Sequence, residues 1–71
     1  MKNKIDFKKG EIAGYKKLIA EANERTEEAL KHNNREDAFV EERRIGYFED
    51  QIFNLERDIR RLEFGLPVYD N

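Results

Sequence analysis

The chain has 71 residues, no cysteine, 42% charged residues and a formal net charge of −2 at pH 7. A single core of this size contributes only about 3–5 kcal/mol of net stability, and no disulfide framework or thiolate metal site can add to it. The slightly acidic balance excludes a generally basic surface for nucleic acid. Apolar runs are too short to span a bilayer and no apolar leader opens the chain, so we expect a soluble, cytoplasmic protein of one domain.

The first predicted element is a helix over about residues 6–32. Its apolar residues follow a frame of three and four residues, which indicates one heptad seam; the frame is Ile5, Ile12, Tyr15, Ile19, Ala22, Thr26 and Ala29. Lys8 interrupts that frame with a charge. Gly10 and Gly14 each cost up to about 1 kcal/mol relative to Ala inside a helix. Either Gly14 accommodates the ring of Phe53 from the second helix, or Gly10 marks a late start of the first.

A turn is predicted at residues 32–34, where two asparagines interrupt the helical pattern. Asn33 is followed three residues later by Glu36, and Asn34 by Asp37. Either pair can cap the first amide groups of a following helix and place a carboxylate near its positive end. The turn therefore leads directly into a second helix.

The second predicted helix spans about residues 35–64 and carries the more regular stripe. Its a and d positions are Ile45, Phe48, Ile52, Leu55, Ile59, Leu62 and Leu66. Gly65 can adopt a left-handed conformation and Pro67 cannot continue a helix, so the helix ends there. A short tail, residues 65–71, follows.

Folding the chain at the turn pairs residues whose numbers sum to 67, and the two seams then coincide. The predicted pairs are Ile5 with Leu62, Ile12 with Leu55, Tyr15 with Ile52, Ile19 with Phe48, Ala22 with Ile45, and Ala29 with Ala38. We therefore expect an all-α, coiled-coil-like antiparallel hairpin of two helices. Thr26 faces Glu41 in one polar layer, which either fixes the register or lets Glu41 reach water.

Several apolar residues lie off the seam, where one partner helix cannot cover them; they are Leu18, Leu30, Phe39, Val40, Tyr47, Phe53 and Phe64. Phe39, Gly46 and Phe53 are seven residues apart and form a second apolar line on the second helix. We expect Leu18, Leu30, Phe39, Gly46 and Phe53 to form a face for dimerisation or for a partner, with a four-helix bundle as the simplest result. The alternative is a scatter of exposed apolar side chains.

The sequence offers little for catalysis. His32 is the single histidine, and serine and cysteine are absent. The sequence has no glycine-rich phosphate loop. Glu28 and His32 are four residues apart, whereas the bundle metal motif needs three. We therefore expect no enzyme activity, no metal and no cofactor.

The predicted rod is polarised along its length. Residues 18–50, around the turn, hold ten acids and five bases, a net charge of −5, whereas residues 1–17 and 51–71 hold nine bases and six acids, a net charge of +3. This polarity favours an antiparallel dimer, a basic open end that binds nucleic acid, or an acidic turn end that binds a basic protein surface. The candidate nucleic-acid contacts are Lys8, Lys9, Lys16, Lys17, Arg57, Arg60 and Arg61.

From these patterns we expect a non-enzymatic protein-protein interaction module. It would be a small regulator, inhibitor or assembly adaptor that acts as a homodimer, binds another protein and does not contact a membrane. The alternative is a small regulator that binds nucleic acid through the basic open end of the hairpin.

Overall fold

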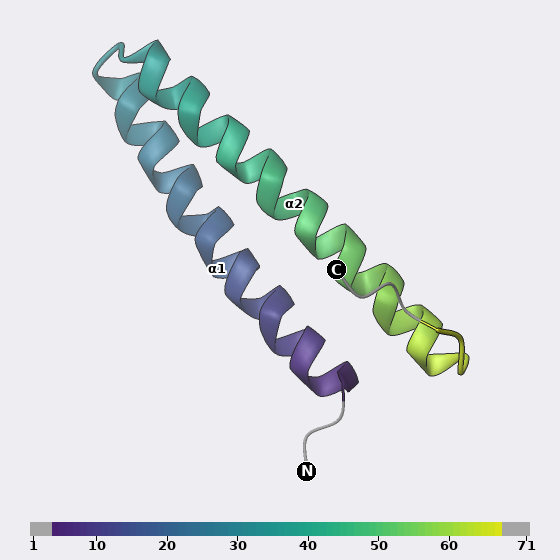
Figure 1. Ribbon diagram of the computed structural model, residues 1–71. Helices are drawn as coiled ribbons and strands as arrows, with labels where there is room; N and C mark the ends of the chain where they lie inside the picture. The colour runs from purple at the N-terminus through teal and green to yellow at the C-terminus, as the bar shows by residue number, and fades with distance from the viewer. Residues whose placement is uncertain (1–3, 68–71) are drawn as a thin grey trace.

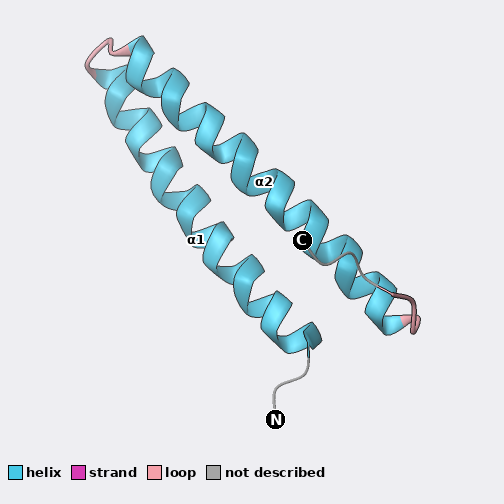
Figure 2. Ribbon diagram, viewed as in Figure 1, coloured by secondary structure: helices cyan, strands magenta, loops and turns pink. Residues whose placement is uncertain are grey.

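The computed structural model describes residues 4–67 and contains two helices, α1 (Lys4–Lys31) and α2 (Arg35–Glu63). The helices run antiparallel along most of their length from a short connection at residues 32–34 (Figure 1). Figure 2 shows that the rest of the described chain is this connection and the segment after α2. The predicted all-α hairpin of two packed helices is therefore confirmed.

The observed helix bounds differ slightly from the predicted ones. α1 begins at Lys4 and ends at Lys31, and α2 begins at Arg35 and ends at Glu63. Gly10 therefore lies inside α1, and the interpretation of Gly10 as a late helix start is wrong. Residues 68–71 of the predicted tail lie outside the described residues.

The turn is built from two asparagines with different tasks. Asn33 adopts a positive φ of 56°, and the amide of Asn34 donates to the carbonyl of Ala29 at 2.8 Å. Together with the bond from the Asn33 amide to the Leu30 carbonyl, this closes α1 in a Schellman motif. Asn34 then caps α2, because its Oδ1 accepts from the Asp37 amide at 3.2 Å. Of the two predicted capping pairs, Asn34 with Asp37 is the one that forms.

The far end of α2 repeats the same arrangement. Gly65 adopts a φ of 71°, which confirms the predicted left-handed conformation. The amide of Gly65 donates to the Leu62 carbonyl, and the amide of Leu66 donates to the Arg61 carbonyl at 2.7 Å. Arg61 Nε also donates to the Pro67 carbonyl, which holds the segment after α2 against the helix.

The core between the helices is thin. Within residues 4–67 its buried apolar residues are Ile12, Ala22, Ala38 and Ile59, and none of these described residues has a large, fully buried side chain. Most of the remaining seam residues are half-buried, among them Tyr15, Ile19, Ile45, Phe48, Ile52, Leu55 and Leu62. Leu66, predicted to continue the stripe of α2, is 48% exposed. Two helices cover each other on one side only, so the seam excludes water incompletely.

Side-chain contacts across the seam give its register. Lys8 contacts Asp58 and Arg25 contacts Glu41, and the residue numbers in both pairs sum to 66. This is one residue from the predicted sum. The rings of Tyr15 and Phe48 meet with centroids 5.8 Å apart, so an aromatic pair joins neighbouring layers in the middle of the rod.

Candidate interaction surfaces

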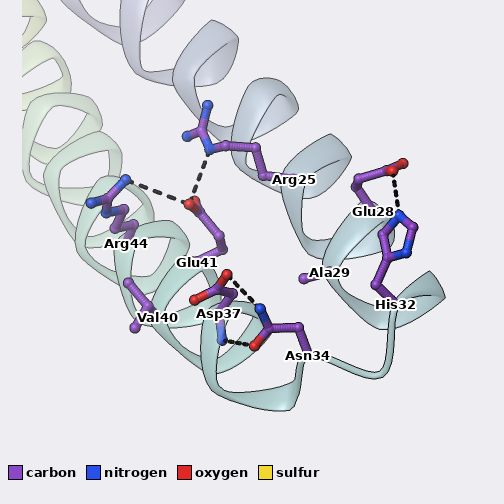
Figure 3. Close-up of a pocket in the computed structure, with 9 residues that line it drawn as sticks. All are labelled: Arg25, Glu28, Ala29, His32, Asn34, Asp37, Val40, Glu41 and Arg44. Carbon is purple, nitrogen blue, oxygen red and sulfur yellow. Dashed lines mark hydrogen bonds and ion pairs between the residues drawn. The ribbon is translucent and has the colours of Figure 1, made fainter.

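A buried carboxylate sits close to the turn. Glu41 is 8% exposed and lies at a seam position of α2. Its Oε1 accepts from Arg25 Nε of α1 at 3.0 Å and from Arg44 Nη1 of α2 at 3.5 Å (Figure 3). Its Oε2 is buried and has no hydrogen-bond partner among the described residues. The hydrogen bond from Arg25 to Glu41 raises the pKa of the Arg25 guanidinium further above its ordinary value.

Of the two interpretations of the predicted polar layer, the one in which Glu41 reaches water is wrong, and the one in which the layer fixes the register stays a prediction. Thr26 does not bind Glu41, because its hydroxyl donates to the Ala22 carbonyl within α1 at 2.9 Å. Nor does Glu41 extend into water, because two arginines hold its carboxylate at the seam. The side chains of Arg25 and Arg44 are longer than that of Thr26, so they reach the Glu41 carboxylate beside the alanine-rich layer of the seam.

A second buried carboxylate lies toward the open end of the hairpin. Asp58 is 6% exposed and accepts from Lys8 Nζ at 3.4 Å and from Arg57 Nη2 at 3.3 Å. The Lys8 side chain is 17% exposed. The charge that interrupts the predicted seam is therefore compensated by an acid from the opposite helix, immediately before the buried Ile59.

One face of the hairpin carries a groove along the middle of the rod, here called the median groove. It consists of two depressions that share Leu18. Its charged lining residues are Glu11, Arg25, Arg43 and Arg44. Its apolar lining is Gly14, Tyr15, Leu18, Val40, Tyr47 and Phe48. Leu18, Val40 and Tyr47 are 40%, 47% and 58% exposed, so large apolar side chains from both helices meet water here.

A separate line of apolar residues, here called the outer stripe, consists of Phe39, Gly46 and Phe53 on α2. Residues seven apart in a helix differ by only about 20° in direction, so these three point the same way. Phe39 and Phe53 are 59% and 61% exposed. Gly46 directly precedes Tyr47, so the outer stripe is rotated by about 100° from the median groove.

The five residues predicted to share one face are therefore divided. Leu18 lines the median groove with Tyr47, away from the outer stripe. Leu30 is exposed on α1, about 120° around that helix from Leu18. The hairpin thus has two apolar surfaces, and Val40 and Tyr47 belong to the first, although the prediction left them outside the partner face.

Glutamates accompany the outer stripe. Each stripe residue is followed three positions later by an acid, which lies between the stripe and the seam; these acids are Glu42, Glu49 and Glu56. All three are exposed. On the other flank of the stripe, the guanidinium of Arg43 lies 6.0 Å from the centroid of the Phe39 ring. The outer stripe is therefore apolar along its centre and acidic along the edge nearer the seam.

The helical glycines face open space within the hairpin. A Cβ atom added to Gly10, Gly14 or Gly46 would meet no atom within 4 Å beyond its local backbone. The prediction that Gly14 receives the ring of Phe53 is therefore wrong, and that ring is mainly exposed. Packing between α1 and α2 does not explain these three glycines.

The predicted basic cluster is brought together only in part. Lys9, Lys16 and Arg60 line one shallow groove with Ile12, Ala13, Glu56 and Ile59. Lys8 and Arg57 contact Asp58 instead, and Arg61 binds the Pro67 carbonyl. Lys17 directly follows Lys16 on α1 and is exposed. Three of the seven candidate phosphate contacts therefore share a surface.

The turn end contains a small polar groove lined by residues of both helices (Figure 3). Within it, His32 Nε2 lies 3.0 Å from Glu28 Oε1, and both side chains are mainly exposed. No group of three His, Cys, Asp or Glu residues within residues 4–67 is placed to hold a metal ion. Neither α1 nor α2 is long and apolar enough to cross a membrane.

Comparison with protein-family models, curated proteins and solved structures gave no match to this chain.

Proposed function

We propose that this protein is a non-enzymatic interaction module that acts as a homodimer and binds another protein, as a small regulator, inhibitor or assembly adaptor. The carrying observation is the imbalance between buried and exposed apolar side chains. Among residues 4–67, four apolar residues are buried, two of them alanines, whereas nine large ones are exposed. Isolated exposed apolar residues are common, whereas apolar residues that share one face, as in the median groove and the outer stripe, are typical of binding sites.

The outer stripe is the surface we assign to the other protein. Its regular spacing along α2 fits a helix laid alongside, in the manner of an amphipathic helix in a groove. A second copy of this chain fits less well. In an antiparallel arrangement centred on Gly46 it would bring Glu42 near Glu49 of the other copy, and like charges there oppose association.

The acids beside the stripe define the chemistry of the partner. Glu42 and Glu49 favour a helix with lysine or arginine next to its apolar face. Phe39 and Phe53 offer two aromatic contacts to that face, with Gly46 between them, where the absence of a side chain allows close approach. The proposed partner is therefore an amphipathic helix with a basic flank.

The test uses a synthetic amphipathic helix of leucine and lysine, with a second peptide that has glutamate in place of lysine. We expect the basic peptide to bind and the acidic one not to bind, by fluorescence anisotropy at physiological salt. Changing both Phe39→Ser and Phe53→Ser should weaken binding at least tenfold, because truncated aromatic contacts often cost about 2 kcal/mol. Both rings are exposed, so the hairpin should stay folded.

Phe7→Ser is the matched control, because Phe7 is 65% exposed on α1. It should leave peptide binding unchanged. Equal binding of the basic and acidic peptides, or equal binding by the stripe variant and the wild-type chain, would refute the assignment of the outer stripe.

A second candidate function, nucleic-acid binding, is favoured by the groove that Lys9, Lys16 and Arg60 line together. If phosphate contacts dominate there, affinity for duplex DNA or RNA should fall steeply between about 50 and 200 mM salt. Lys16→Glu with Arg60→Glu should abolish it. A filter-binding measurement at 50 mM salt decides the matter, since no detectable complex under that condition removes this function.

A further inference from the structure

We infer that two copies of this chain pair antiparallel through the median groove, so that the acidic turn end of each lies beside the basic open end of the other. This inference rests on the proposed homodimer and specifies its surface and direction. The observations that carry it are the position of the groove along the rod and the order of charges on either side of Leu18.

The median groove lies at the middle of the hairpin. Leu18 is central in α1, which spans Lys4–Lys31, and Tyr47 lies two residues from the centre of α2, which spans Arg35–Glu63. A twofold axis that crosses the rod at this level therefore places the apolar lining of one copy against that of the other. Such an interface is self-complementary, as a twofold dimer requires.

One line of α1 has an acid and a base arranged symmetrically about Leu18. Glu11 and Arg25 lie seven residues before and after Leu18, and all three border the groove. The antiparallel axis brings Glu11 of each copy to the level of Arg25 of the other, which forms two opposite-charge contacts per dimer. Arg25 is 49% exposed beyond its bond with Glu41, so it remains accessible.

Electrostatic repulsion disfavours a parallel arrangement of the two copies. This arrangement would place the two turn ends together, and each carries a net charge of −5 over residues 18–50. It would also place the two basic ends together. At low salt this difference favours the antiparallel arrangement.

The exposure of apolar side chains supports self-association on this face. Leu18, Val40 and Tyr47 are all at least 40% exposed, and no large side chain of the described part of the chain is fully buried. When the groove of a second copy packs against them, the two thin cores join into the core of one four-helix bundle. Gly14 lies in the groove beside Tyr15 and has open space at its Cβ position, which leaves room for a second backbone.

The experiment uses the natural absence of cysteine, because one introduced thiol is then the single reactive site. The wild-type chain should sediment as a dimer at tens of micromolar. Chains with Lys4→Cys and chains with His32→Cys, mixed in equal amounts, should be joined to each other by a short bismaleimide reagent. His32→Cys chains alone should not be joined, because an antiparallel dimer separates the two turns by most of a 49 Å rod.

A charge variant tests the groove itself. Glu11→Lys should weaken dimerisation about tenfold, because two attractive contacts become repulsive. Glu63→Lys is the matched control. It makes the same change of charge at the open end, at an exposed position of α2 about 160° around that helix from Tyr47, and should leave the dimer unchanged.

The outcomes separate the inference from the proposed function. If His32→Cys chains are joined to each other and the mixed pair is not, the antiparallel arrangement is overturned while the homodimer stands. If Glu11→Lys and Glu63→Lys dimerise alike, the median groove is overturned as the interface. A wild-type chain that sediments as a monomer overturns both the inference and the homodimer, whereas binding of the basic helix to the outer stripe is measured independently.

Discussion

Asp58→Leu is expected to lower the free energy of unfolding by about 3 kcal/mol, because it removes a buried acid and leaves its basic partners Lys8 and Arg57. The Lys8 side chain is 17% exposed and contacts Asp58 at 3.4 Å, so its charge would lose its acid without regaining full hydration. A hairpin with about 3–5 kcal/mol of net stability would then retain only about 0–2 kcal/mol. Urea unfolding followed by circular dichroism at 222 nm, at one fixed protein concentration, measures the loss.

The double variant with Lys8→Met and Asp58→Leu supplies the control. Removing the two more buried charges and filling the space with apolar groups should recover most of the lost stability, because the third charge, Arg57, is 38% exposed and stays hydrated. Glu41→Gln provides a second comparison and should cost less than Asp58→Leu, because its arginine partners are 49% and 57% exposed and stay hydrated. If Asp58→Leu unfolds at the same urea concentration as the wild-type chain, the pair contributes nothing to the fold.

Replacing the three helical glycines by alanine should stabilise the hairpin by about 1.5–3 kcal/mol in total. Gly10, Gly14 and Gly46 lie inside α1 and α2, and an added Cβ meets nothing within 4 Å. Each change restricts the unfolded chain and favours the helix by about 0.5–1 kcal/mol. The melting temperature of a chain of this length should therefore rise by roughly 10 °C or more.

Gly65→Ala is the control that should act in the opposite direction. Gly65 also has open space around it, but its φ of 71° is a conformation that alanine disfavours by about 1–2 kcal/mol. Melting curves should be recorded on dilute protein, where self-association contributes least. A loss of stability in Gly10→Ala under those conditions would contradict the expectation, because Gly10 belongs to neither apolar surface.

The architecture could be predicted from the sequence because its main determinants are local or periodic. The seam of α2 repeats at a and d positions from Ile45 to Leu62, and one turn gives it a single antiparallel partner. Glycine at position 65 favours a left-handed conformation at a helix end, and asparagine at position 34 favours a helix cap that binds the Asp37 amide. The left-handed Asn33 was missed because asparagine suits both a helix cap and a helix end.

The surfaces were predicted less well because they depend on direction around each helix. Leu18 was grouped with Phe39 and Phe53 because all three lie off the seam, although its spacing from Glu11 and Arg25 already marks a separate line on α1. The buried Asp58 was not predicted, because it lies outside the a and d positions and most carboxylates are exposed. Lys8 was the residue that could have indicated this buried acid, because a charge at a seam position needs an acid on the opposite helix.

Two opposing trends run along the hairpin from the turn to the open end. Contacts next to the turn close a short loop at little entropic cost, whereas the contact of Lys8 with Asp58 spans 50 residues of chain. The side chains next to the turn are small, however, and the bulky Tyr15 and Phe48 meet further along. We therefore expect the two helices to pair first next to the turn, where the contacts stabilise them little. The pairing should become stable only when the middle layers pack. The open end of the hairpin should unfold locally first. Within the described residues, amide hydrogen exchange should therefore be fastest at the start of α1 and at the end of α2.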